Sequence, residues 1–239
     1  MINKKMSPDY CPDFQNGETI LIDKPLRISS FRVIEKVRKV INFRKIGHAG
    51  TLDPLATGLL ILCTGKKTKE IEKYQSLKKV YCGIITLGLY SESFDLETET
   101  NTFPIPDNLN EEKIIQVSRQ FIGEIEQLPP MYSAVKKNGK RLYQSARKGK
   151  EVERERRKVL IYDFIIDKVE LPDIHFTIEC SKGTYIRAIA DDFGKALGTR
   201  ATLSSLRRKR IGEFDVKDAF DLKEFSELFQ TEKNKLNYC

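Results

Sequence analysis

The apolar residues of this chain come in short runs, and this pattern limits the folds that the chain can adopt. The longest uninterrupted run spans the five residues 59–63, LLILC, whereas a helix needs about 20 apolar residues to cross a bilayer. The N-terminus, MINKKMSPDYCPDF, has no apolar signal core. Because 40% of the 239 residues are hydrophobic, the chain can fill a core. We expect a globular protein with no membrane span.

Periodicity predicts strands and helices that do not follow a strict β–α–β order. In 174–180 (IHFTIEC), for example, apolar and polar residues alternate, as in a strand with one wet face that carries His175. This mixture favours an α+β fold with a mixed, mainly antiparallel sheet flanked by helices. The other predicted strands cover 18–25, 59–63, 80–87 and 159–166. The predicted helices begin at Ser30 (with Phe31, Ile34, Val37 and Ile41 on one face), run from Asn110 to Ile122 before Gly123, and run from Thr184 to Gly198.

Residues 1–17 are expected to form a flexible tail. Residues 18–215 are expected to form one domain, the catalytic one that the family resemblance given below implies. Within it, 91–158 begins with a polar, proline-containing connection, and it includes an RNA-contacting segment, an expectation that rests on the charges described next. Residues 216–239 are expected to be a short C-terminal extension.

The positive charge is concentrated in one segment. The chain has a formal charge of +8, and residues 136–158 hold eleven Lys or Arg against three Glu, which equals the whole excess. Such runs are usually solvated surface, as we expect for RRKR at 207–210. Tyr132, Tyr143 and Tyr185 lie within or near the basic segments, and aromatic rings beside cations favour binding to nucleic acid.

Cysteine usage and motif searches argue against a bound metal or nucleotide. The five cysteines are odd in number and form no CxxC pair, which argues against a disulfide framework and a zinc site. GxGxxG and HExxH are absent, and Gly58 and Gly65 are too far apart for a phosphate loop. We expect a cytoplasmic protein that works without cofactor or metal.

Two charged residues occupy unusual positions. Asp53 precedes Pro54 in GHAGTLDPLATG, residues 47–58, so its backbone is pushed toward an extended conformation. The glycines let a ligand approach closely, although an Asx-type turn explains the local sequence equally simply. Arg187 would lie in the first turn of a helix capped by Thr184, where the helix dipole disfavours a cation by roughly 0.3–1 kcal/mol. A nearby carboxylate would compensate, unless the arginine extends into solvent.

Several blocks of the chain together resemble the TruB family of tRNA pseudouridine synthases. They occur in the family's order and cover about residues 18–215. The resemblance implies a pseudouridine synthase fold with an active-site cleft across the sheet. It also implies isomerisation of uridine to pseudouridine at position 55, in the T loop of tRNA, without cofactor or metal. The matching blocks are LIDKP (21–25), GHAGTLDPLATGLLILCTGKKTK (47–69), KVYCGIITLG (79–88), LPPMYSAVKKNGKRLYQSARKG (128–149) and CSKGTYIRAIADDFGKALG (180–198).

The resemblance also implies residue roles. Asp53 matches the catalytic aspartate, and His48 the histidine that enters the T loop and fills the space of the flipped base. Tyr81 matches the active-site tyrosine that packs on the target base, and Arg187 the arginine that pairs with the catalytic carboxylate. Asp95 aligns with an aspartate of that network, although SESFDLE replaces the more usual TDT-like string. Positions that line or flank the pocket are matched by Lys24, Lys182, Tyr185 and Leu206.

The implied partner is the T stem-loop of tRNA, bound by a monomer that needs no protein partner. Many family members carry a C-terminal RNA-binding domain of the PUA type, which we do not expect in this chain because the last predicted element is followed only by TEKNKLNYC. Two alternatives remain: a tRNA-binding or folding chaperone with the same fold, and a synthase that acts on other RNA. A pure binder would not need Asp53, Tyr81 and Arg187 together, which favours the enzyme.

Overall fold

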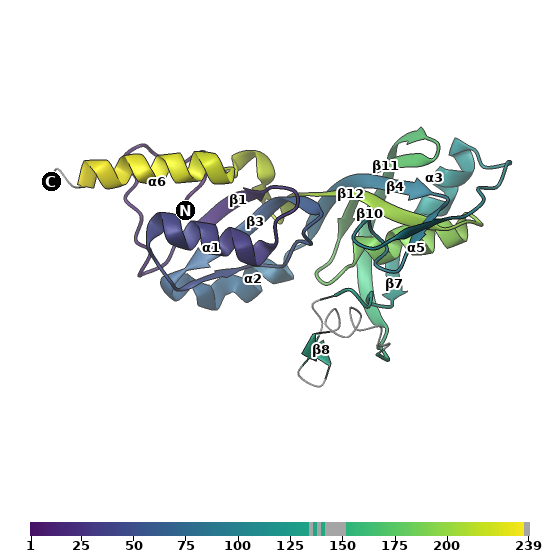
Figure 1. Cartoon of the computed structure of the whole chain (residues 1–239), viewed down its shortest axis with the longest axis horizontal. Helices are drawn as coiled ribbons and strands as arrows, with labels where there is room; N and C mark the ends of the chain where they lie inside the picture. Colours follow the sequence, from purple (N-terminus) through teal and green to yellow (C-terminus); the bar gives the residue numbers. More distant parts are fainter. Residues whose placement is uncertain (134–135, 138–139, 142–151, 237–239) are drawn as a thin grey trace. The chain divides into compact units, whose positions relative to one another are not determined.

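The computed structural model describes residues 1–133, 136–137, 140–141 and 152–236. The chain forms two compact units, one made of residues 1–81 and the chain from 207 onward, the other of residues 82–206. Two strands, β4 (Lys79–Leu87) and β12 (Ala201–Ile211), contribute residues to both units (Figure 1). No helix in these described ranges is long and apolar enough to span a membrane.

The first unit is built on an antiparallel sheet. Strand β1 (Thr19–Lys24) pairs with β3 (Ala56–Thr64), with Lys24 opposite Gly58. Strand β2 (Ile46–His48) also pairs with β3, and β12 lies on the other side of β3 from β1, with β13 (Phe214–Asp215) on β12. The strands predicted at 18–25 and 59–63 are therefore confirmed. The register brings the end of β1 beside the start of β3, where the 47–58 segment ends.

Alternate residues of β1 and β3 face two separate cores. One core is covered by α1 (Ser30–Ile41) and α6 (Leu222–Leu236). The other is covered by α2 (Ile71–Ser76), which follows the 3-10 helix η1 (Gly65–Glu70). A second 3-10 helix, η2 (Val216–Asp218), precedes α6. The first core contains Ile20, Ile22, Leu60 and Leu62, and the second contains Leu21, Leu59, Ile61 and Cys63.

Helix α1 begins and ends on recognisable caps. The Ser29 hydroxyl accepts a hydrogen bond from the Arg32 amide at 3.2 Å, and Asn42 ends the helix at a φ of 50°. Ile34 is buried as predicted, but the side chain of Phe31 is 58% exposed. Each helical residue advances about 100°, and position 31 therefore lies about a quarter turn from the buried stripe. That stripe is Ser30, Val33, Ile34, Val37 and Ile41.

The first 17 residues pack against the first unit and are not the flexible tail that we expected. Ile2 is fully buried, its amide donates to the Thr19 carbonyl at 2.8 Å, and its carbonyl accepts from the Leu21 amide at 3.0 Å. Apolar side chains recur every four residues from Ile2 through Met6, Tyr10 and Phe14 and contact the α1–α6 core. The polar overall composition of the segment concealed this periodicity.

The second unit is also mainly antiparallel. β10 (Arg157–Glu170) pairs with β11 (Asp173–Cys180) on one side and β7 (Gly123–Gln127) on the other, and the order continues from β11 to β4 and β12. Phe121, which follows α3 (Glu111–Arg119), forms an aromatic cluster with Phe164 of β10 and Phe193 of α5 (Ile186–Ala196). The two short hairpins are β5 (Leu89–Ser91) with β6 (Thr100–Thr102) and β8 (Lys136–Lys137) with β9 (Lys140–Arg141).

The predicted α+β class, with a mainly antiparallel sheet flanked by helices, is confirmed, and most corrections concern helix ends. α3 ends at Arg119, before Ile122, and Gly123 instead opens β7 with a φ of 108°. α5 begins at Ile186 and has Tyr185 at its N-cap position, so Thr184 is not the cap. The burial of β11 alternates as predicted, and His175 lies on its wetter face, 3.3 Å from Glu170.

Candidate active site

The residues predicted to act on substrate divide between the two units. The first unit holds Asp53 on the segment 47–58, which we call the aspartate loop. It also holds the side chains of His48, Lys24 and Tyr81. The second unit holds Asp95, Arg187, Lys182, Tyr185 and Leu206.

The aspartate loop is fixed to the N-terminal end of α1. The Ser30 hydroxyl is bonded to both the amide and the carbonyl of Leu52, each at 2.9 Å. The amide of Arg27, which has a φ of 62°, donates to the Pro54 carbonyl at 2.8 Å. The Ala56 amide closes a turn onto the Asp53 carbonyl at 3.1 Å. Hydrogen bonds to backbone groups therefore hold the residues on both sides of Asp53, while Asp53 itself is partly exposed.

A buried arginine supports the same loop from β12. Arg208 is 1% exposed, and its guanidinium donates to the Leu59 carbonyl at 2.8 Å and the Gly50 carbonyl at 3.1 Å. Gly58 has a φ of 105°, and a Cβ there would lie 2.3 Å from the Arg208 carbonyl oxygen. Only glycine fits at this close approach. Our expectation that 207–210 is solvated surface is thus wrong for Arg208, and Arg207 makes a bidentate ion pair with Asp23 at 3.0 and 2.6 Å.

Lys24 lies beneath the loop rather than on a surface. Its side chain is fully buried, and the ammonium donates to the carbonyls of Ile28 at 2.7 Å, Pro25 at 3.0 Å and Pro54 at 3.4 Å. Burial lowers the pKa of Lys24 to about 8, while the charge of Asp53 acts in the opposite direction. These contacts make Lys24 a link between β1 and the residue that follows Asp53.

His48 and Tyr81 are the other predicted residues of the first unit. His48 lies in β2 opposite Leu62 and is partly exposed. Burial, and secondarily the charge of Arg208, hold the pKa of His48 below its usual value of 6.5. A neutral imidazole at pH 7 can pack against a ligand without adding a charge. Tyr81 is 8% exposed and lies on β4.

In the second unit the structure brings Asp95 and Arg187 together. Both are buried, with the Arg187 Nε 3.5 Å from a carboxylate oxygen of Asp95. The same guanidinium donates to the carbonyls of Ser93 at 3.0 Å and Tyr132 at 2.8 Å. Arg187 is the second residue of α5, so this carboxylate compensates for the unfavourable helix dipole as the sequence required.

Tyr185 is held by a side chain that sequence analysis did not single out. Gln127, which is 1% exposed, accepts from the Tyr185 amide at 2.7 Å and donates to its carbonyl at 2.9 Å. The guanidinium of Arg157 lies 5.0 Å from the centre of the Tyr185 ring, a cation–π distance. Lys182 is exposed, and Leu206 is partly buried on β12. Thr184 donates its hydroxyl to the Ser181 carbonyl at 3.0 Å.

Much of the basic segment 136–158 lies outside the described residues, namely residues 138–139 and residues 142–151 with Tyr143. Within its described end, Arg154 donates to the Pro129 carbonyl at 3.0 Å and Lys158 pairs with Glu124 at 2.8 Å. The expected RNA contacts of this segment stay a prediction. The described ranges contain no cluster of three or more His, Cys, Asp or Glu placed to hold a metal ion.

The α+β fold with a mainly antiparallel sheet is the fold that the resemblance in the sequence implies, that of a pseudouridine synthase. The family described as TruB family pseudouridylate synthase (N terminal domain) matches residues 38–186. The tRNA pseudouridylate synthase B C-terminal domain matches residues 187–238. The chain belongs to the TruB family of pseudouridine synthases.

Similar proteins are found among bacterial enzymes. A tRNA pseudouridine synthase B from Flavobacterium johnsoniae is 48% identical, with 94% of this chain and 100% of the relative covered. One of the same name from Chloroherpeton thalassium is also 48% identical, over 87% of this chain and 88% of the relative. This chain therefore covers most or all of the length of both relatives.

Solved structures with the same fold come from larger assemblies. A Cbf5–Nop10–Gar1 complex contains a chain that is 28% identical, with a TM-score of 0.73 over 97% of this chain. An H/ACA RNP bound to a substrate RNA containing 2'-deoxyuridine contains one that is 27% identical, with a TM-score of 0.70 over 93%. This chain covers 63% and 56% of those chains, respectively.

Proposed function

We propose that this chain isomerises uridine to pseudouridine at position 55 in the T loop of tRNA, with the Asp53 carboxylate as the catalytic group. The observation that carries the proposal is the aspartate loop, whose backbone is held before and after Asp53 by hydrogen bonds while Asp53 is partly exposed. Such preorganisation is what a nucleophile or base needs to meet a bound substrate in one geometry. The family and the names of the relatives support the reaction and the class of RNA.

The reaction breaks the bond between N1 of uracil and C1′ of ribose and forms a bond from C5 to C1′. The hydrogen on C5 is released as a proton and N1 takes up a proton, so the reaction is an isomerisation that needs no oxidant or reductant. An ionised Asp53 has three routes: attack on the ribose, attack on the base, or removal of the C2′ proton. Each route requires the base to leave its stack, which costs a few kcal/mol.

The remaining predicted residues have supporting roles in this proposal. His48 fills the space that the flipped base leaves, and the Tyr81 ring packs on that base. Arg187 acts at the substrate pocket, and the 3.5 Å contact with Asp95 orients its guanidinium. Lys24 holds the loop, whereas Lys182, Tyr185 and Leu206 line or flank the pocket.

We further propose that the protein acts as a cytoplasmic monomer with no protein partner. The odd number of cysteines favours a reducing compartment, and tRNA is an intracellular substrate. Light scattering of the purified protein coupled to gel filtration should return a mass near 27.6 kDa. A mass near twice that value would contradict the monomer.

Tritium release from a T-arm stem-loop that carries C5-tritiated uridine tests the function directly. We expect release by the wild type and none by Asp53→Asn, a variant of almost the same shape that removes only the negative charge. The variant should bind the RNA within a few-fold of the wild type. Release by Asp53→Asn would remove Asp53 from its role, and RNA that is bound by the wild type without release would favour a tRNA chaperone.

A further inference from the structure

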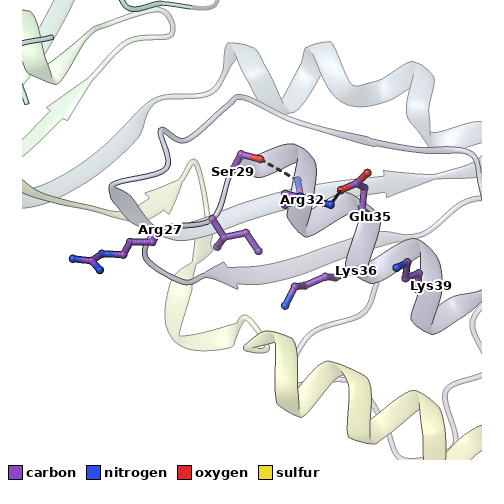
Figure 2. Close-up of a pocket in the computed structure, with 7 residues that line it drawn as sticks. Arg27, Ser29, Arg32, Glu35, Lys36 and Lys39 are labelled. Carbon is purple, nitrogen blue, oxygen red and sulfur yellow. Dashed lines mark hydrogen bonds and ion pairs between the residues drawn. The ribbon is translucent and has the colours of Figure 1, made fainter. Parts of the chain in front are cut away.

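A basic surface lies along α1, outside the predicted catalytic residues. It borders a hollow of about 420 Å³ that is lined by residues 27–29 and by Arg32, Glu35, Lys36 and Lys39 (Figure 2). We call the side chains of Arg27, Arg32, Lys36 and Lys39 the α1 basic surface. All four are exposed. Glu35, the acidic residue among them, pairs with Arg32 at 2.9 Å, so a net positive charge remains.

The surface begins at the aspartate loop. The Arg27 amide is bonded to the carbonyl of Pro54, the residue next to Asp53, at 2.8 Å, while the Arg27 side chain extends away from α1 (Figure 2). Arg32, Lys36 and Lys39 are spaced i, i+4 and i+7, so they follow one face of the helix. At 1.5 Å per residue, this face covers about 10 Å. From Arg27, which precedes α1, the three cations of the helix therefore lead away from the loop that carries the predicted catalytic carboxylate.

Two exposed apolar side chains accompany these cations. Leu26 is 53% exposed and Phe31 is 58% exposed, although both adjoin the well-packed start of α1. Neither residue belongs to the two cores of the first unit. An exposed aromatic ring beside guanidinium and ammonium groups is the combination that binds RNA, since the cations neutralise phosphates and the ring stacks on an unpaired base.

We propose that the α1 basic surface binds the sugar-phosphate backbone of the substrate RNA beside the uridine that Asp53 acts on. This inference rests on the proposed function for the position of the uridine. The surface contributes affinity and places the RNA strand along α1, because phosphate contacts position a nucleic acid without reading its sequence. Glu35 opposes this binding through its own charge.

A charge-matched pair of double variants tests the proposal. Lys36→Ala/Lys39→Ala removes two cations from α1, whereas Lys69→Ala/Lys73→Ala removes two exposed cations from η1 and α2, which cover the opposite face of the sheet. The dissociation constant of a fluorescent T-arm stem-loop is measured from 50 to 200 mM salt. We expect the α1 variant to bind several-fold more weakly and its salt slope to fall by about 1 to 2, at about 0.7–0.9 per lost phosphate contact.

A variant that removes a negative charge instead of a positive one controls for a loss of RNA binding caused by damage to α1. Glu35→Gln removes the negative charge from the same surface, so we expect tighter binding and a lower KM. The α2-side variant should match the wild type in affinity and in kcat/KM. Equal effects of the two lysine pairs, or an unchanged salt slope in the α1 variant, would overturn the proposal.

The proposal and the proposed function fail in different ways. Loss of the isomerase function would appear as absent tritium release by the wild type, whatever the lysine variants do. Loss of the α1 proposal would appear as normal release together with affinities that do not distinguish α1 from η1 and α2. Binding that depends on Lys36 and Lys39 without any release would keep the RNA surface and refute the reaction.

Discussion

At the scale of single residues, His48 shows how the fold tunes a side chain that the motif identifies. Burial and the charge of Arg208 hold its pKa below 6.5. Between the folded pKa and 6.5 the unfolded chain therefore binds more protons, so His48 lowers stability as the pH falls through this window. The chain has two histidines, so an NMR titration gives two imidazole signals that His175→Gln assigns. We expect the His48 signal to titrate below 6.5; a midpoint at or above that value would contradict the buried environment.

Arg208 is the residue whose role the sequence least reveals. In the run RRKR, nothing distinguishes it from its exposed neighbours Lys209 and Arg210. We expect Arg208→Met to lower the free energy of unfolding by about 2 kcal/mol or more, since the carbonyls of Gly50 and Leu59 lose their donor. Urea denaturation measures the loss. Arg210→Ala is the control, and a similar small effect of both variants would show that the buried contacts of Arg208 contribute little.

At the scale of elements, two adjacent serines at the start of α1 have different roles, since one caps the helix and the other supports the aspartate loop. Ser29 caps the helix, whereas the Ser30 hydroxyl holds Leu52 in the aspartate loop. Each alanine substitution should cost about 1 kcal/mol of stability. Only Ser30→Ala displaces the residue before Asp53, and we therefore expect kcat to fall in this variant and to stay near the wild type in Ser29→Ala. Tritium release at saturating RNA measures both, and equal kcat values would refute a positioning role for Ser30.

The strands could be predicted from the sequence because their apolar pattern is local. The contacts that hold the candidate site could not be predicted, because they join residues far apart in the sequence. Alternation in 174–180 and the apolar run at 59–63 fix two strands without knowledge of their neighbours. Asp53 and His48 are apparent from one glycine-rich motif. Ser30, Gln127 and Arg208 hold backbone groups 22, 58 and 149 to 158 residues away, and no local pattern encodes such partners. The prediction that Phe31 lies on the buried face of α1 is wrong, because in a short helix the spacing of the apolar residues does not fix where the edge of the buried face lies.

At the scale of the molecule, each unit has its own core, and the first unit draws its core from both ends of the chain. Ile2 and Phe14 from the N-terminal segment and Phe225 and Phe229 from α6 contact the α1 side of the sheet. The ring centres of Phe14 and Phe229 are 5.8 Å apart, a favourable aromatic distance. The chain ends therefore stabilise the unit that carries the aspartate loop.

Because the N-terminal segment contributes to this core, a substitution at Ile2 tests whether that segment is part of the folded unit. Ile2 is fully buried, and we expect Ile2→Ala to cost about 2–5 kcal/mol, as a buried Ile-to-Ala change does elsewhere. Asp9→Ala, an exposed site in the same segment, should change stability by less than about 0.5 kcal/mol. Urea denaturation compares the two. If residues 1–17 were a flexible tail, both variants would match the wild type; a large loss in Ile2→Ala alone requires the segment to be part of the folded core.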